Sequence, residues 1–203
     1  MKKQFLLLTV LFFLLGACAP KPAEHSFIKV NADGQFVRDG KPYYFVGTNF
    51  WYGAILGSEG EGGNRERLHK ELDFLKSIGI NNLRVLVGAD GENGIKTRVE
   101  PSLQVAPGVY NDTILAGLDY ERDMTAVLDL NTSWEWSGGY SVYLQWSGHG
   151  DAVVPAVDGW PAYMEYVKQF PQSDSAKALF ANHVNYIVSR TNRYNQIKYV
   201  DDP

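Results

Sequence analysis

Short apolar runs that end abruptly in polar and aromatic residues recur along this chain. Residues 124–130 form a β-branched run that is too short for a buried helix, so the run predicts a buried parallel strand. It leads into residues 131–139, where two tryptophans flank a glutamate and two glycines follow. Residues 44–48 show the same pattern. Ligands of parallel α/β folds bind at the carboxyl ends of the strands, so both segments predict ligand contact. The alternative is a tryptophan-rich loop that only packs over the rim of the sheet.

Helical periodicity alternates with these strands. Asn64 is expected to cap a helix over residues 65–78 that has an apolar stripe, followed by Gly79 and by a strand over residues 80–87. Asp112 is expected to cap a second helix, which ends near Tyr120 and is short for a crossover between parallel strands. A third helix is expected from Ser173 or Asp174. This alternation of helix and strand is typical of an α/β fold with a parallel sheet.

The segments between these elements predict turns and loops. Two Asp-Gly dipeptides within residues 27–46 predict a β-hairpin near the amino terminus. Residues 88–111 and the stretch after Gly139 are expected to be long loops.

The first residues have the pattern of a bacterial export signal. Lys2 and Lys3 precede an apolar stretch over residues 5–15, which is too short to span a membrane as a stable helix. The tetrapeptide that ends at Cys18, the only cysteine, looks like a lipobox. We therefore expect a signal peptide (residues 1–17), a tether (residues 18–26) and a lipid-anchored protein of the cell envelope or outer surface. The alternative is an ordinary signal peptide with an incidental cysteine.

Composition narrows the possible functions. Hydrophobic residues make up 45% and aromatic residues 13% of the chain, which is typical of a globular protein. The net charge is −4 and no basic patch stands out, which argues against a nucleic-acid partner. The four histidines are scattered and no metal-ligand, phosphate-loop or dinucleotide motif occurs. The sequence therefore predicts neither a metal nor a cofactor.

Arg84 is the most informative candidate for chemistry. An arginine in the middle of a buried strand cannot lose its charge, so it needs a carboxylate partner, and Asp129 is the one candidate on the other strands. The place of Arg84 near the functional end of the strand favours a role in function, and the alternative is a structural ion pair. Glu135 lies between Trp134 and Trp136, whose apolar rings would raise the pKa of its carboxyl and make it a candidate acid. The alternative, a solvated loop carboxylate, is the favoured interpretation. His183 falls on the apolar stripe of the third helix, which favours a core histidine over a ligand. Aromatic residues mixed with polar groups at strand ends suit a sugar, which stacks on indoles and takes hydrogen bonds at its hydroxyls.

Several segments together resemble the β-mannanases of glycoside hydrolase family 5. They are residues 45–51, residues 82–85, the 131–139 loop, residues 190–194 and residues 199–203, and they come in the family's order. The resemblance implies a (β/α)8 TIM barrel that hydrolyses β-1,4 bonds of β-mannan or a related plant polysaccharide. It implies retention of configuration through a glutamate nucleophile and a glutamate acid/base. It assigns Arg84 to orienting the nucleophile, so the carboxylate partner of Arg84 is expected to be missing from this chain. It assigns the sugar cleft to Asn49, Trp51, Asn131, Trp134, Glu135 and Trp136.

The chain also departs from the family's pattern. It ends before the Asn-Glu-Pro sequence that carries the family's acid/base, and Asp129 stands where an apolar or aromatic residue is expected. Residues 27–203 are therefore expected to form an incomplete barrel, roughly the first three βα units preceded by the hairpin. Without both glutamates the chain is expected to be inactive alone. The alternatives are a non-catalytic glycan-binding surface lipoprotein and a product that does not fold stably.

Overall fold

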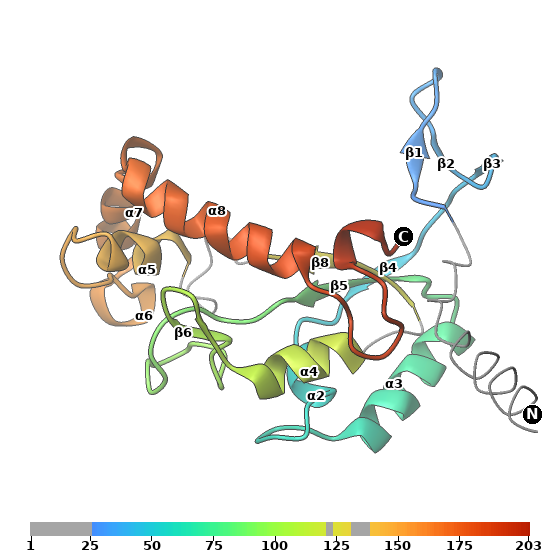
Figure 1. Ribbon diagram of the computed structural model, residues 1–203, viewed down its shortest axis with the longest axis horizontal. Coiled ribbons are helices and arrows are strands. Elements are labelled where there is room, and N and C mark those ends of the chain that lie inside the picture. Colours follow the sequence, from blue (N-terminus) through green and yellow to red (C-terminus); the bar gives the residue numbers. More distant parts are fainter. Residues whose placement is uncertain (1–25, 121–123, 131–138) are drawn as a thin grey trace, which may run out of the picture.

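The computed structural model describes residues 26–120, 124–130 and 139–203. Its centre is a parallel sheet of three strands in the order β4-β5-β8, where β4 is Gly47–Asn49, β5 is Asn82–Leu86 and β8 is Thr125–Asp129 (Figure 1). Arg84 lies opposite Asn49 on one neighbouring strand and Val127 on the other. The predicted α/β class and the predicted strands over residues 80–87 and 124–130 are therefore confirmed, with slightly narrower bounds.

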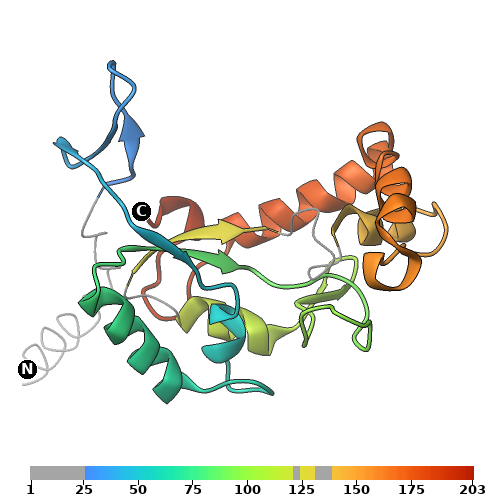
Figure 2. The same cartoon turned by 180° about the vertical axis from the view of Figure 1, so that it is seen from behind.

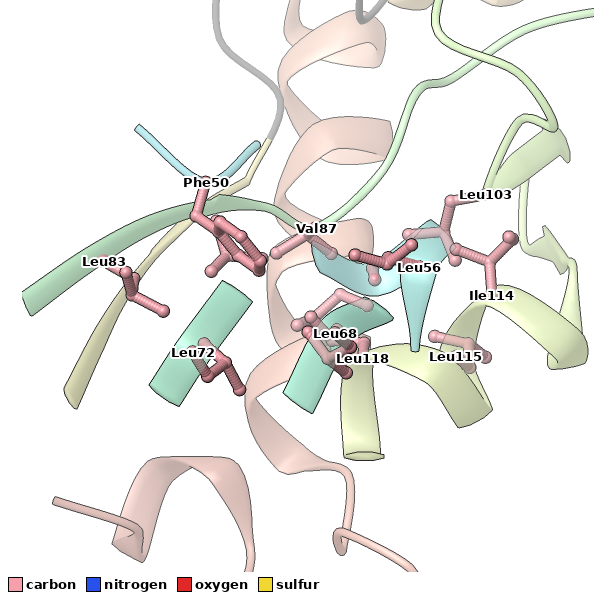
Figure 3. Close-up of a cluster of buried hydrophobic side chains, with 13 residues drawn as sticks. Phe50, Leu56, Leu68, Leu72, Leu83, Val87, Leu103, Ile114, Leu115 and Leu118 are labelled. Atoms are coloured by element: carbon pink, nitrogen blue, oxygen red, sulfur yellow. The ribbon is translucent and has the colours of Figure 1, made fainter. Parts of the chain in front are cut away.

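One face of the sheet packs against helices. Helices α2 (Gly53–Leu56), α3 (Arg65–Ser77) and α4 (Asp112–Tyr120) contribute leucines and isoleucine to a core that also contains Phe50 and the alternate residues of β5. Figure 3 shows Phe50, Leu83 and Val87 on the sheet side of this core and Leu68, Leu72 and Leu118 on the helix side. Since successive side chains of a strand point to opposite faces, Leu83 and Val85 face this core and Arg84 faces away from it.

The helix termini agree with the sequence signals with one exception. Asn64 caps α3, because its side chain accepts a hydrogen bond from the Arg67 N–H at 2.9 Å. Ser173 caps α8 (Asp174–Ser189) through the Ala176 N–H at 3.3 Å. The predicted cap of α4 was wrong: Asn111 accepts from the Thr113 N–H at 3.1 Å, and Asp112 is the first helical residue. The Asp112 carboxylate instead forms an ion pair with Arg193, with 2.9 Å between Oδ1 and Nη2.

The amino-terminal hairpin is confirmed and carries one additional strand. Strands β1 (Lys29–Val30), β2 (Phe36–Arg38) and β3 (Lys41–Pro42) form a small antiparallel sheet. It projects from the body of the molecule (Figures 1 and 2). Gly34 and Gly40 have φ values of 76° and 74° at its turns, which explains why glycine follows aspartate there.

The two predicted long loops contain regular structure, so that prediction was wrong. Residues 88–111 contain a hairpin of β6 (Gln104–Ala106) and β7 (Val109–Tyr110). From Gly139 on, the chain forms α5 (Gly139–Trp146), α6 (Pro155–Asp158), α7 (Trp160–Val167) and the short helix η2 (Phe170–Gln172). These helices surround a second core of Tyr143, Leu144, Phe170 and Ala176.

A buried charge cluster ties the carboxyl-terminal segment to α4. The Asp119 side chain is fully buried and accepts hydrogen bonds from Arg190 at 2.9 Å, Arg193 at 2.8 Å and the Tyr199 hydroxyl at 2.7 Å. Tyr199 lies in the last short helix, η3 (Tyr199–Asp201), which comes after α8. The cluster holds α8 and η3 beside α4, with α8 running from there to the α5–α7 helices (Figures 1 and 2). Among the described residues, no helix is long and apolar enough to cross a membrane.

Candidate functional site

The face of the sheet that points away from α2–α4 carries a small polar group, in which Asn49 and Asp129 are the last residues of their strands and Arg84 is the central residue of β5. Arg84 of β5 donates through Nη1 to Asn49 Oδ1 of β4 at 2.7 Å, and through Nη2 to Asp129 Oδ2 of β8. Three adjacent parallel strands therefore each supply one member. The register explains the meeting: Asn49 pairs with Arg84, while Asp129 lies one pleat further along β8 on the same face.

Asp129 is the carboxylate partner that Arg84 required, so the need for such a partner is confirmed, and the expectation that the partner is missing from this chain was wrong. The expectation of an apolar or aromatic residue at position 129 belongs to the family's pattern, and in this chain the carboxylate is used for the ion pair. The Asp129 side chain is 5% exposed, whereas the Arg84 side chain is 42% exposed. Asp129 Oδ1 is buried and has no hydrogen-bond partner in the described part of the chain. A buried acceptor without a donor is costly to the stability of the fold.

Arg84 keeps capacity for a further acceptor. A guanidinium has five N–H donors in a fixed plane, and the bonds to Asn49 and Asp129 use two of them. Val127, its neighbour on β8, is 57% exposed, so the face around the guanidinium is open. The arrangement can therefore bind a second carboxylate or several hydroxyl groups.

Trp51 follows two residues after Asn49, the last residue of β4. Its side chain is 40% exposed, and the Phe50 N–H beside it donates to the Arg84 carbonyl at 2.9 Å. The Tyr52 ring stands edge-on to the indole at 5.3 Å between ring centroids. An exposed, braced indole next to hydrogen-bonding groups is the combination that the sequence predicted for sugar contact.

Other predicted site residues cannot be placed in this geometry. Asn131, Trp134, Glu135 and Trp136 lie outside the described residues, and so does Cys18. Their assignments stay predictions.

His183 is buried, as predicted for a core histidine. It is 2% exposed, and its Nδ1 lies 3.2 Å from the Tyr110 hydroxyl. Burial lowers the pKa of the His183 imidazole, although the charge of Asp90 opposes this effect. Across residues 26–120, 124–130 and 139–203 no group of three or more His, Cys, Asp or Glu side chains could hold a metal ion.

Sequence reasoning missed the residues of the 88–111 segment that lie beside Trp51. Thr97, Arg98, Val99 and Glu100 line the same pocket as Trp51 and Tyr52. No periodicity or spacing marks these residues, because their segment is irregular. The signal that could have found them is Arg98 itself, a cation in a segment rich in glycine and acidic residues.

Comparison with known proteins gives one consistent family. Residues 25–203 match the model of the family described as glycoside hydrolase family 5 beta-mannosidase-like. Mannan endo-1,4-beta-mannosidase 1 of Oryza sativa subsp. japonica is 26% identical over 181 residues, which cover 86% of this chain and 38% of that protein. Mannan endo-1,4-beta-mannosidase 1 of Solanum lycopersicum is 25% identical over 94% of this chain and 45% of its own length.

Solved structures agree with this match. The glycoside hydrolase family 5 mannosidase from Rhizomucor miehei superimposes with a TM-score of 0.80 at 35% identity, over 87% of this chain and 46% of that one. A structure of that enzyme in complex with mannosyl-fructose gives a TM-score of 0.82 at 34% identity. The endo-1,4-beta-mannanase of the same organism matches in fold alone, with a TM-score of 0.66 at 23% identity. The chain spans less than half the length of these relatives.

Proposed function

Because the chain belongs to the beta-mannosidase-like group of glycoside hydrolase family 5, we propose that it forms part of the substrate site of a glycosidase that cleaves β-mannosidic bonds in mannans. The observation that carries the proposal is the group of Arg84, Asn49 and Asp129 at the carboxyl ends of adjacent parallel strands. In parallel α/β folds this end of the sheet is where ligands bind and react.

Arg84 has the properties of a residue that positions a nucleophile. Retaining glycosidases use two carboxyl groups about 5–5.5 Å apart, and the nucleophilic one must be ionised. A guanidinium stays charged and donates hydrogen bonds in a fixed plane, so it keeps a neighbouring carboxylate ionised and oriented. The N–H groups of Arg84 that Asn49 and Asp129 leave unused would serve this purpose.

The two reacting carboxylates are proposed to come from outside the described strands. Across β4, β5 and β8 the only carboxylate is Asp129, and Arg84 already engages it. A retaining reaction needs a second carboxyl group that is free to donate a proton. We therefore infer that residues 1–203 alone bind mannan without hydrolysing it.

Affinity electrophoresis and an activity assay test both parts. The chain should be retarded in a gel that contains galactomannan, and Arg84→Met should run faster than the unchanged chain, because it loses a charged donor. Trp160→Ala, which removes an exposed indole from α7, should be retarded as strongly as the unchanged chain. Equal mobility of all forms with and without galactomannan contradicts the binding site. Turnover of galactomannan well above background contradicts the proposed need for further carboxylates.

The amino terminus supports a second proposal on where the protein acts. The lipobox-like sequence ending at Cys18 favours a lipid anchor at the cell envelope. The anchored protein would be either an enzyme or a non-catalytic glycan-binding protein. Metabolic labelling with a radioactive fatty acid tests it. The unchanged chain should carry label in the membrane fraction, and Cys18→Ala should carry none; label on both forms contradicts this proposal.

A further inference from the structure

The amino-terminal hairpin of β1, β2 and β3 has no core of its own. No residue from 26 to 46 is buried. The hairpin projects from the body of the molecule, and in the described part of the chain no helix packs on it (Figures 1 and 2). Short strands are stable only when a hydrophobic face of their sheet is covered or a helix packs on it. The hairpin therefore still needs a surface to pack against.

One face of the hairpin gathers apolar side chains and cations. Val30 lies directly opposite Phe36, so both side chains point to the same face. The Phe45 ring meets the Phe36 ring edge-on, with 6.5 Å between ring centroids. Val30, Phe36 and Phe45 are 63%, 51% and 53% exposed. Arg38 and its strand partner Lys41 lie on the same face, because Arg38 is two residues from Phe36. We call these five residues the hairpin face.

The hairpin is positively charged in a chain that is negatively charged overall. Residues 26–46 contain two lysines and one arginine against two aspartates, a net charge of +1, whereas the whole chain carries −4. The Arg38 guanidinium lies 5.7 Å from the centre of the Tyr43 ring, and its Nε donates to the Ser26 carbonyl at 3.1 Å. These contacts hold the cation beside the apolar residues. Exposed apolar side chains with lysine and arginine among them are typical of surfaces that bind the headgroup region of a membrane.

The sequence before the hairpin gives it a short connection to the proposed lipid anchor. Seven residues lie between Cys18 and Ser26, the first described residue. This segment spans at most about 30 Å when fully extended. A tether of this length keeps the hairpin at an effective concentration of about 1 mM at the lipid surface, so even a weak contact with lipid would be populated.

The stem of the hairpin is fixed at the amino ends of the parallel strands. Asn81 directly precedes β5, and its side chain accepts the Val46 N–H at 2.9 Å and donates to the Tyr44 carbonyl at 3.1 Å. Strand β4 begins at Gly47 and ends at Asn49, a member of the candidate site. The hairpin and the candidate site therefore lie toward opposite ends of the strands (Figure 2).

We propose that the hairpin face docks on the membrane that holds the Cys18 lipid, with its three apolar side chains among the headgroups and its two cations at anionic lipids. The inference rests on the proposed lipid anchor and extends it, because the anchor alone fixes no orientation. Docking turns the amino ends of the strands towards the membrane. The Arg84 site then faces away from the lipid, where a polymeric glycan can reach it.

Fluorescence of the anchored chain tests the inference. The full chain is expressed in a bacterium with Ala32→Cys, in the turn between β1 and β2, or with Ala156→Cys in α6 at the other end of the molecule (Figure 1). Each form is reconstituted from the membrane fraction into vesicles of phosphatidylcholine and phosphatidylglycerol and labelled with a thiol-reactive nitrobenzoxadiazole. Cys18 is the only native cysteine and its thiol carries the lipid, so the dye reacts with the introduced cysteine.

The two positions should respond differently. The emission of the dye at position 32 should shift to shorter wavelengths and be quenched by lipids that carry a nitroxide in the headgroup region. The dye at position 156 should show neither effect, because α6 points away from the membrane. Quenching at both positions contradicts the proposed orientation.

Two exposed valines provide a matched pair of variants. Val30→Glu places a carboxylate on the hairpin face and should abolish the emission shift at position 32, because the anionic surface repels it. Val109→Glu adds the same charge to β7, where the valine is 53% exposed, and should leave the shift unchanged. Lys41→Gln removes one exposed cation and no apolar contact, and should lower the ratio of docked to undocked chains about fivefold. An unchanged shift in both Val30→Glu and Lys41→Gln contradicts docking through this face.

The outcomes separate docking from the anchor. Fatty-acid label on Cys18 without quenching at position 32 contradicts docking and leaves the anchor standing. Absence of that label contradicts both, because the hairpin is then not held at a membrane. An emission shift that nitroxide lipids do not quench means that protein covers the hairpin face, which contradicts the inference. The covering protein is a second copy if the shift grows with the number of chains per vesicle, and another part of the same protein if it does not.

Discussion

Arg84 and Asp129 form one ion pair but differ in burial, and this difference decides which residue depends on the other. The aspartate is almost fully buried, whereas the arginine is open to water on one side. A buried carboxylate without its partner keeps the full cost of desolvation, whereas a half-exposed guanidinium can turn to solvent. Arg84 therefore stabilises the fold through Asp129 as well as serving the proposed site.

Removing each partner in turn should show this asymmetry. Arg84→Met should lower the free energy of unfolding by about 3 kcal/mol, because it strands the Asp129 charge. Asp129→Asn should lower it by about 1 kcal/mol or less, because the released arginine is hydrated. Urea denaturation at pH 7 measures both values. Equal losses would mean that water reaches Asp129 in the native state.

His183 gives the molecule a pH dependence with a defined sign. Burial holds the pKa of the His183 imidazole below its value in the unfolded chain, which is about 6.5. Asp90 is the charged group that acts on it, and it only reduces this shift. Between the two pKa values the unfolded state binds more protons than the folded state. Stability is therefore greatest above about pH 6.5 and falls as the pH drops below it.

Thermal unfolding at pH 7 and pH 5 checks the His183 prediction. The melting temperature of the unchanged chain should decrease more from pH 7 to pH 5 than that of His183→Gln, because the glutamine side chain cannot be protonated. His69→Gln is the control, because it removes an imidazole from an exposed position. An identical acid sensitivity of His183→Gln and the unchanged chain would contradict the prediction.

At the scale of elements, the helices and strands that could be predicted from the sequence are those with clear hydrophobic periodicity and capping residues. Helix α3 was predicted to within one residue and the start of α8 was predicted correctly, because both helices have an apolar stripe and a side-chain cap. Strand β5 was predicted with slightly wider bounds than the structure shows. The helices over residues 139–167 were missed because their aromatic and small residues show no clear stripe, and α5 buries Tyr143 against other aromatic rings. Pro155 at the start of α6 and Pro161 near the start of α7 are signals that could have indicated helices there.

The same limit applies to the candidate site. The need of Arg84 for a carboxylate is a consequence of charge and burial alone, and Asp129 could be named because it lies on a neighbouring strand. The pocket beside Trp51 could not be predicted, because Arg98 and Glu100 lie in an irregular segment. Only the folded backbone brings that segment to the end of β4.

The short helix α4 depends on close packing against α2. A Cβ atom at Gly117 would lie 2.0 Å from the Ala54 carbonyl oxygen, so the two helices approach each other at this glycine. Gly117→Ala should lower the free energy of unfolding by about 1–3 kcal/mol, because the overpacking outweighs the gain in helix propensity. Ala116→Ser on the same turn is the control and should stay within about 0.5 kcal/mol of the unchanged chain. Denaturant titration measures both, and a stabilised Gly117→Ala would contradict the contact.

At the scale of the whole molecule, the central sheet is buried on one face and open on the other. Val85 of β5 is 1% exposed against the helices, while Val127 of β8 is 57% exposed on the face that carries Arg84. Parallel sheets usually have both faces covered. The chain as described therefore presents apolar surface around its candidate site.

Exchanging valine for threonine on each face measures this one-sidedness. Val85→Thr should lower the free energy of unfolding by about 1–3 kcal/mol, since it places a hydroxyl in the helix-facing core. Val127→Thr has the same shape change and should stay within about 0.5 kcal/mol of the unchanged chain, because its side chain is already in water. Val127→Thr should also reduce binding of the dye anilinonaphthalene sulfonate, which Val85→Thr should not. An equal loss of stability in the two variants would mean that a further part of the protein covers the Arg84 face in solution. The sugar site proposed there would then be closed to a polymer, so this pair of variants bears on function as well as on folding.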